Sequence, residues 1–169
     1  TKNFVAGTYL FGTLIALVKE GVPILGMINN PITNDLVLRT GETTWLNERP
    51  VRVSNKTSLD QSLLLTTSHN ACSEFRNGPA FDQLIQKSLR YRTWGDCHGY
   101  HLVATGGAEI MTDPILKYWD LMALIPIVEG AGGIITDWYG GDVLKTAGEN
   151  GAVATNGHVH EAAICILNP

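Results

Sequence analysis

Residues 116–133 read LKYWDLMALIPIVEGAGG, and this stretch carries the strongest pattern in the chain. Its apolar side chains recur at three- and four-residue spacing, which predicts a helix with one buried stripe. The stripe consists of Leu121, Leu124, Ile125 and Val128. Asp120 stands directly before it. This carboxylate is either an N-terminal cap that the helix dipole stabilises, or an oxygen ligand for a hard cation such as Mg²⁺.

The composition excludes several classes of protein. The chain has 169 residues, of which 44% are hydrophobic and 17% charged, so it can bury a core. A formal net charge of −4 gives no basic surface for nucleic acid or an anionic membrane, and residues 121–128 are too short to span a bilayer. The three cysteines form no CxxC pair, which favours free thiols in a reducing cytoplasm.

The first third of the chain reads as β-structure. Residues 12–18 and 22–28 are apolar runs joined by a short polar turn, which predicts a hairpin of buried strands. Further short strands are expected at residues 35–39, 43–46 and 51–54, with turns at 40–41 and 47–50. Residues 9–54 therefore predict a meander of mostly antiparallel strands.

From about residue 60 onward, strands and helices alternate. Strands are expected at residues 62–67, 91–94, 109–112, 133–137 and 152–155, and helices at 79–89, 96–105, 119–129 and 158–167. This alternation predicts an α/β fold with a largely parallel, layered sheet. We place a boundary near residues 55–60, so that 1–58 belong to an N-terminal sheet domain and 59–169 form a C-terminal α/β domain.

The motif around Asp120 resembles a known family. Trp119–Asp120, an apolar helix and then Glu129–Gly130–Ala131–Gly132–Gly133 resemble the C-terminal signature of the inositol monophosphatase superfamily of metal-dependent phosphatases. The opening TKNF and the later FGTLIAL resemble the segment that follows that family's D-P-[IL]-D-G-T motif. The resemblance implies a layered αβαβα sandwich and Mg²⁺-dependent hydrolysis of a small phosphorylated metabolite. It also implies that Asp120 binds metal and that Thr1 holds the nucleophilic water.

Other segments are most similar to the histidinol-phosphate phosphatase branch of histidine biosynthesis. These are WGDCHGY at residues 94–100, LVATG at 102–106 and the run from Asp113 to Asp120. The inositol branch usually has a glutamate at the position of Asp113 and a His-Cys pair at Lys117–Tyr118. The resemblance implies a cytoplasmic enzyme, usually a homodimer.

Three residues are candidates for substrate binding. Asp96 and Cys97 open a predicted helix, where backbone N–H groups and a carboxylate can meet the leaving-group alcohol, although Asp96 could equally be a helix cap. Asp113 precedes Pro114, which favours a loop near a strand end. There it either pairs with a cationic amine or imidazole, or is a solvated loop residue.

The expected acidic motifs of the family lie before the threonine of its motif, so Asp120 is the one expected metal-binding carboxylate in the chain. We therefore expect the chain alone to be nearly inactive, to lack the N-terminal part of the fold, and to need that segment or a complementary chain as a partner. The strands at 12–28 would then expose an apolar face. The alternatives are an inositol or sugar phosphatase, and a non-catalytic structural or interaction domain.

Overall fold

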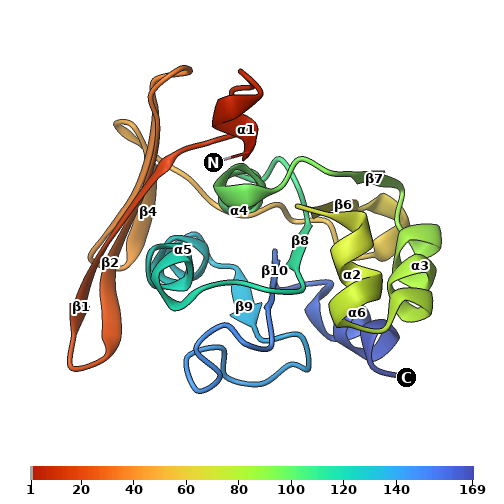
Figure 1. The fold of residues 1–169 in the computed structure, drawn as a ribbon. Coiled ribbons are helices and arrows are strands. Elements are labelled where there is room, and N and C mark those ends of the chain that lie inside the picture. The colour runs from red at the N-terminus through yellow and green to blue at the C-terminus, as the bar shows by residue number, and fades with distance from the viewer. Residues whose placement is uncertain (1) are drawn as a thin grey trace.

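The computed structural model describes residues 2–169 as two five-stranded sheets with helices between and beside them (Figure 1). The first sheet is antiparallel throughout and has the order β1-β2-β3-β4-β5. Its strands are β1 (Thr13–Lys19), β2 (Val22–Asn30), β3 (Asp35–Thr40), β4 (Thr43–Leu46) and β5 (Arg49–Pro50). The predicted meander is therefore confirmed.

The prediction of a strand at residues 51–54 is wrong, because the structure has none there. The last strand of the meander is β5, which lies where a turn was expected. Val51 still donates a backbone hydrogen bond to Thr44 at 2.9 Å, but Val53 donates to the carbonyl of Ala131 at 3.1 Å. The chain has left the sheet at that point, because its backbone groups pair with the end of a helix instead of a neighbouring strand.

The second sheet is mixed, with the order β7-β6-β8-β10-β9. Its strands are β6 (Leu63–Thr66), β7 (Arg90–Arg92), β8 (Ile110–Asp113), β9 (Ile134–Thr136) and β10 (Ala152–Thr155). β6 pairs in parallel with β7 and β8, whereas β10 is antiparallel to both β8 and β9. Because β10 is antiparallel to both of its neighbours, β6, β7, β8 and β9 run in one direction, which agrees with the prediction of a largely parallel sheet, and the reversed β10 was not predicted. The connection from β9 to β10 contains no helix, so β10 returns between β8 and β9 without a parallel crossover.

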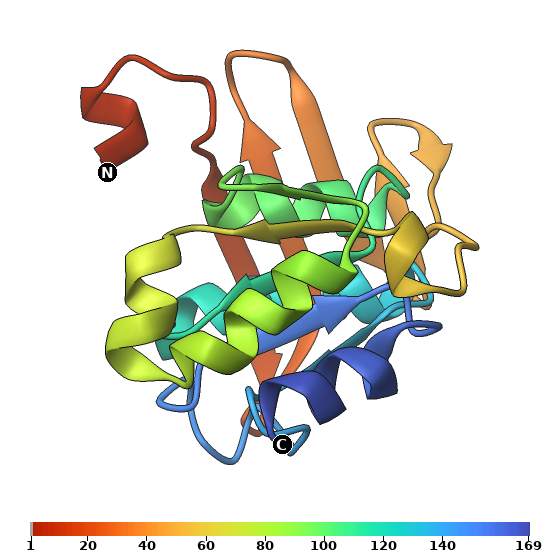
Figure 2. The same cartoon turned by 90° about the vertical axis from the view of Figure 1, so that its right-hand side faces the viewer.

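Helices complete the layers. They are α1 (Lys2–Val5), α2 (His69–Phe75), α3 (Gly78–Lys87), α4 (Asp96–Ala104), α5 (Tyr118–Gly130) and α6 (His160–Leu167), with a 3₁₀ turn at Leu59–Gln61. α4 and α5 lie between the sheets, and α2, α3 and α6 cover the far face of the second sheet (Figure 2). The order of layers is β, α, β, α, which is the expected sandwich without its first helical layer. α1 and α2 were not predicted.

Helix α5 is the centre of the core. Every residue from Leu121 to Val128 is buried, whereas the sequence pattern predicted that only one face of this helix would be buried. The reason is that sheets pack on both of its sides: the core around it includes Ile28 from β2 and Met111 from β8. A helix that is apolar all round is typical of the interior between two layers.

The outer face of the first sheet is apolar and exposed, as expected. Ile15 and Leu17 of β1 are 51% and 56% exposed, and Val22 and Ile24 of β2 are 53% and 45% exposed. Among residues 2–169, none of the helices is long and apolar enough to cross a membrane. The division into two domains at residues 58 and 59 stays a prediction.

Gly26 provides a test of the contact between β2 and α5. A Cβ atom there would overlap the carbonyl oxygen of Ala123 and lie 2.7 Å from Pro126 Cγ. We expect Gly26→Ala to lower the free energy of unfolding by about 1–3 kcal/mol, because the strand must move away from the helix. Gln83→Ala, at an exposed position of α3, is the control and should change it by less than about 0.5 kcal/mol. Denaturant unfolding measures both, and equal effects would contradict the packing described.

Candidate functional site

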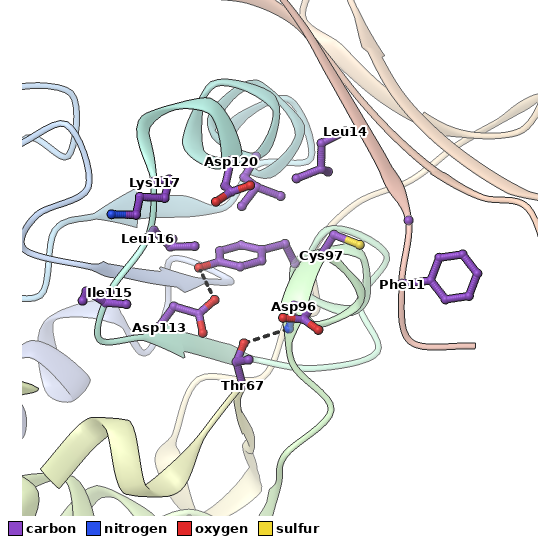
Figure 3. A pocket seen from close by; sticks show the side chains of 13 residues that line it. Phe11, Leu14, Thr67, Asp96, Cys97, Asp113, Ile115, Leu116, Lys117 and Asp120 are labelled. Carbon is purple, nitrogen blue, oxygen red and sulfur yellow. Dashed lines mark hydrogen bonds between the residues drawn. The ribbon is translucent and has the colours of Figure 1, made fainter. Parts of the chain in front are cut away.

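A cavity of about 320 Å³ opens where the first turn of α5, the first turn of α4 and the end of β8 meet the chain leading into β1. Figure 3 shows the side chains that line it. Four of the predicted site residues are among them: Asp96, Cys97, Asp113 and Asp120. Thr1, the fifth, lies outside the described residues. Residues far apart in the sequence are thus brought to one cavity.

Asp120 lies in the first turn of α5 and lines the cavity, as predicted from its place before the apolar stripe. Burial raises the pKa of its carboxyl, while a backbone hydrogen bond at Lys117 lowers it. Lys117 is the N-cap residue of α5 and no side-chain hydrogen bond caps this helix, so Asp120 is an acidic residue of the first turn and not its cap. Its position in the cavity agrees with the ligand interpretation, and the role as a metal ligand stays a prediction.

Asp113 is the last residue of β8, and its exposed fraction is only 3%. The prediction of a loop position was wrong, and so is the alternative of a solvated loop aspartate, because β8 pairs with β10 through this residue. The hydroxyl of Tyr100 donates to Asp113 Oδ2 at 3.0 Å. The pKa of Asp113 is raised to about 7, mainly by burial and also by the charge of Asp96. Hydrogen bonds from Thr67 and Tyr100 act in the opposite direction and lower it.

Asp96 begins α4 in an uncommon conformation. Its φ of 49° lies in the left-handed region, which non-glycine residues rarely adopt. Its backbone N–H donates to Thr67 Oγ1 at 2.8 Å, and its carboxylate accepts a hydrogen bond from Asn3 Nδ2 at 2.5 Å. No side-chain hydrogen bond caps α4, so the structure does not support the cap interpretation. Gly95 is required here, because a Cβ atom would overlap Thr67 Cα.

Cys97 follows Asp96 and lines the same cavity. Burial raises the pKa of its thiol to about 11, and the charge of Asp96 adds to the effect. The side chain is therefore a neutral thiol near pH 7 and contributes a small, weakly polar surface to the cavity instead of a nucleophile.

Two residues that the sequence did not single out also line the cavity: Thr67 and Tyr100. Thr67 directly follows β6, and open α/β sheets place ligands at the carboxyl ends of their strands, so its position carried a signal. Tyr100 lies in the middle of α4 and has no exposed surface. It belongs to the segment WGDCHGY, but the sequence alone does not distinguish a tyrosine of the site from one of the core.

The described residues do not form a complete metal site. Among residues 2–169, no group of three or more histidine, cysteine, aspartate or glutamate side chains is placed to hold an ion. Asp96 accepts a hydrogen bond from Asn3, and Asp113 accepts one from Tyr100. The side chain of Asp120 makes no hydrogen bond or salt bridge to another described side chain. Asp120 can therefore supply one oxygen ligand to Mg²⁺, an ion that usually completes its coordination with water and with phosphate oxygens of the substrate.

The chain is similar to known phosphatases. Residues 1–168 match the model of the inositol monophosphatase family. The bifunctional phosphatase IMPL2, chloroplastic, of Arabidopsis thaliana is 39% identical over 161 residues, which are 94% of this chain and 46% of that protein. The histidinol-phosphatase of Chlorobaculum parvum is 38% identical over 141 residues, 83% of this chain and 54% of that protein. The chain thus spans about half the length of these curated relatives.

A solved structure agrees with the fold. An inositol monophosphatase from Zymomonas mobilis superposes with a TM-score of 0.90 and 34% sequence identity, over 99% of this chain and 66% of that one. The relatives by sequence and by structure therefore include both histidinol and inositol phosphatases.

The buried carboxyl of Asp113 predicts a pH-dependent stability. Its pKa is about 7 in the folded protein and 3.8 in the reference state, so the unfolded chain loses this proton first. The free energy of unfolding should therefore fall as pH rises from about 4 to about 7. Asp113→Asn removes the charge, and we expect it to stabilise the protein by about 1–2 kcal/mol at pH 8 and by nothing at pH 4.

Denaturant unfolding of the full-length protein at both pH values measures this difference. Asp60→Asn, at an exposed position, is the control and should behave alike at pH 4 and pH 8. A change of stability for Asp113→Asn that is the same at both pH values would show that Asp113 ionises without penalty in the folded state.

Proposed function

This chain belongs to the inositol monophosphatase family, and we propose that the full-length protein is a Mg²⁺-dependent phosphomonoesterase whose substrate is histidinol phosphate. The observation that carries the proposal is the cavity in which Asp96, Asp113 and Asp120 meet. Each of these residues lies in a sequence motif that resembles the family, and the fold brings the three motifs together. Activity is proposed for the full-length protein because this chain spans about half of its curated relatives.

We assign Asp120 to the metal side of the reaction. The ion would neutralise phosphate charge and lower the pKa of the attacking water. Asp120 is suited to one ligand position, since the first turn of a buried helix holds its carboxylate in place. Thr1 is proposed to hold the nucleophilic water. The remaining ligands would come from residues outside 2–169.

We assign Asp96, Cys97 and Asp113 to the leaving-group side. Histidinol carries an amine and an imidazole, and a cavity with several carboxylates favours such cations. Asp113 faces the cavity from the end of a strand and Asp96 from the start of a helix, so a small alcohol can contact both. Cys97 adds a neutral surface, and the start of α4 offers backbone N–H groups to the alcohol oxygen.

A second candidate is an inositol or sugar phosphatase, which the similarity to the Zymomonas mobilis structure favours. The hydroxyl groups of a neutral polyol can donate hydrogen bonds to these carboxylates, but only a cationic alcohol also gains the attraction between opposite charges, which is why we prefer it. A third candidate is a non-catalytic domain that retains the fold.

We further propose a cytoplasmic homodimer in which the exposed apolar face of β1 and β2 is covered by an N-terminal segment. The support for this cover is the exposure of Ile15, Leu17, Val22 and Ile24, which is unusual for a contiguous apolar face in water.

The direct test is a phosphate-release assay on the full-length protein with Mg²⁺, using histidinol phosphate, inositol 1-phosphate and glycerol 2-phosphate. We expect the highest kcat/KM for histidinol phosphate. A preference for inositol 1-phosphate would favour the second candidate, and no release from any of the three would favour a non-catalytic domain.

Asp120→Asn tests the metal assignment. The amide keeps the shape and removes the charge, so we expect kcat for histidinol phosphate to fall at least about a hundredfold, with an unchanged circular dichroism spectrum. Glu161→Gln, an exposed position on α6, makes the same chemical change away from the cavity and should retain normal turnover. A near-normal rate for Asp120→Asn would remove Asp120 from the metal site.

A further inference from the structure

Tyr100 ends the segment WGDCHGY, for which the sequence predicted roles for Asp96 and Cys97 but none for the tyrosine. It is the fifth residue of α4 and has no exposed surface, yet its ring borders the cavity and its hydroxyl donates to Asp113 Oδ2 at 3.0 Å. A buried phenol normally needs a hydrogen-bond partner, and here the partner is the carboxylate that we assign to substrate binding. The pair therefore links the interior of α4 to the site.

Close packing fixes the distance between the two residues. Gly99, next to Tyr100, faces β8 so closely that a Cβ atom would overlap Met111 Sδ. Helix α4 and strand β8 are thus in tight contact two residues before Asp113, which ends that strand. This close packing brings α4 against β8, and the hydrogen bond between Tyr100 and Asp113 joins the two elements beside it.

Asp113 retains capacity for a further partner. The hydroxyl of Tyr100 donates to Asp113 Oδ2 from α4, and Thr67, which follows β6, lines the same cavity. A carboxylate offers about four lone-pair positions, so the donor from Tyr100 leaves room for others from the cavity. Because this donor comes from a helix packed behind the strand, it fixes the orientation of the carboxylate as well as supporting its charge.

We propose that Tyr100 is a positioning residue, whose hydroxyl holds the Asp113 carboxylate in place and in its charged form to receive a cationic group of the substrate alcohol. The inference rests on the proposed function in that it takes this cavity as the substrate site. It adds a determinant of specificity. The preference for a cationic over a neutral alcohol would depend on Tyr100, which acts through Asp113 and does not contact the substrate itself.

The surroundings of Asp113 make it dependent on this hydroxyl. The titratable and charged groups near it are Asp96 and Cys97 of α4, Asp120 and Lys117 at the start of α5, and Cys72 of α2. The charge of Asp96 raises the pKa of Asp113, and Lys117, the one cation that lines the cavity among residues 2–169, has an exposed side chain. The pKa of Tyr100 is raised well above 10, because it is buried beside Asp113, so it remains a donor throughout the neutral range.

The first experiment measures the ionisation of Asp113 directly, by ¹³C NMR titration of aspartate-labelled full-length protein. The signal missing in Asp113→Asn identifies the residue. We expect a midpoint near pH 7 in the unsubstituted protein and a midpoint about one pH unit higher in Tyr100→Phe, which keeps the ring and loses the donor.

Tyr91→Phe is the matched control. The Tyr91 hydroxyl bonds to His69 Nδ1 at 3.2 Å and does not line the cavity, so its removal should leave the midpoint unchanged. An unchanged midpoint in Tyr100→Phe, or an equal shift in Tyr91→Phe, would overturn the inference. This readout needs no turnover, so it decides the inference even if the protein hydrolyses no phosphate monoester and the proposed function fails.

The second experiment compares KM values at two pH values. A one-unit shift from pH 7 lowers the ionised fraction of Asp113 about fivefold at pH 7 and less than twofold at pH 8.5. Tyr100→Phe should therefore raise KM for histidinol phosphate about fivefold at pH 7 and less than twofold at pH 8.5, with kcat nearly unchanged. KM for glycerol 2-phosphate should stay within twofold. Equal increases for both substrates would show a merely structural role.

Discussion

The burial of α5 between two sheets is the constraint on which the rest of the structure depends. β2 approaches the helix at Gly26, where no side chain could fit, and the second sheet closes the opposite side. A helix packed on both sides is held in position, and its first turn lines the same cavity as the first turn of α4 and the end of β8. The cavity at that junction, and the position of Asp120 in it, follow from this packing.

The sequence predicted the features that depend on local pattern. The hairpin at residues 12–28, helix α5 and the position of Asp120 could be read from spacing, and the family resemblance joined Asp96, Asp113 and Asp120 into one site. What it could not predict depends on distant partners. The segment at 51–54 leaves the sheet because Val53 pairs with the end of α5, and β10 reverses direction because of a connection without a helix.

The same limit applies to the site. A proline after Asp113 indicated a loop, but pairing with β10 keeps the residue in a strand and buries it. Burial then raises the pKa of Asp113, whereas hydrogen bonds from Tyr100 and Thr67 lower it. Whether this carboxyl is charged at neutral pH is thus decided by contacts between β8, α4 and the end of β6, which no short sequence motif contains.

The central claim is that this chain supplies the leaving-group side of a phosphatase site and one of its metal ligands. The most direct measurement is phosphate release from histidinol phosphate by residues 1–169 and by the full-length protein, side by side, with millimolar Mg²⁺. A single carboxylate ligand should bind Mg²⁺ only weakly, so the account predicts turnover by the full-length protein and almost none by 1–169. Robust Mg²⁺-dependent turnover by 1–169 alone would contradict it.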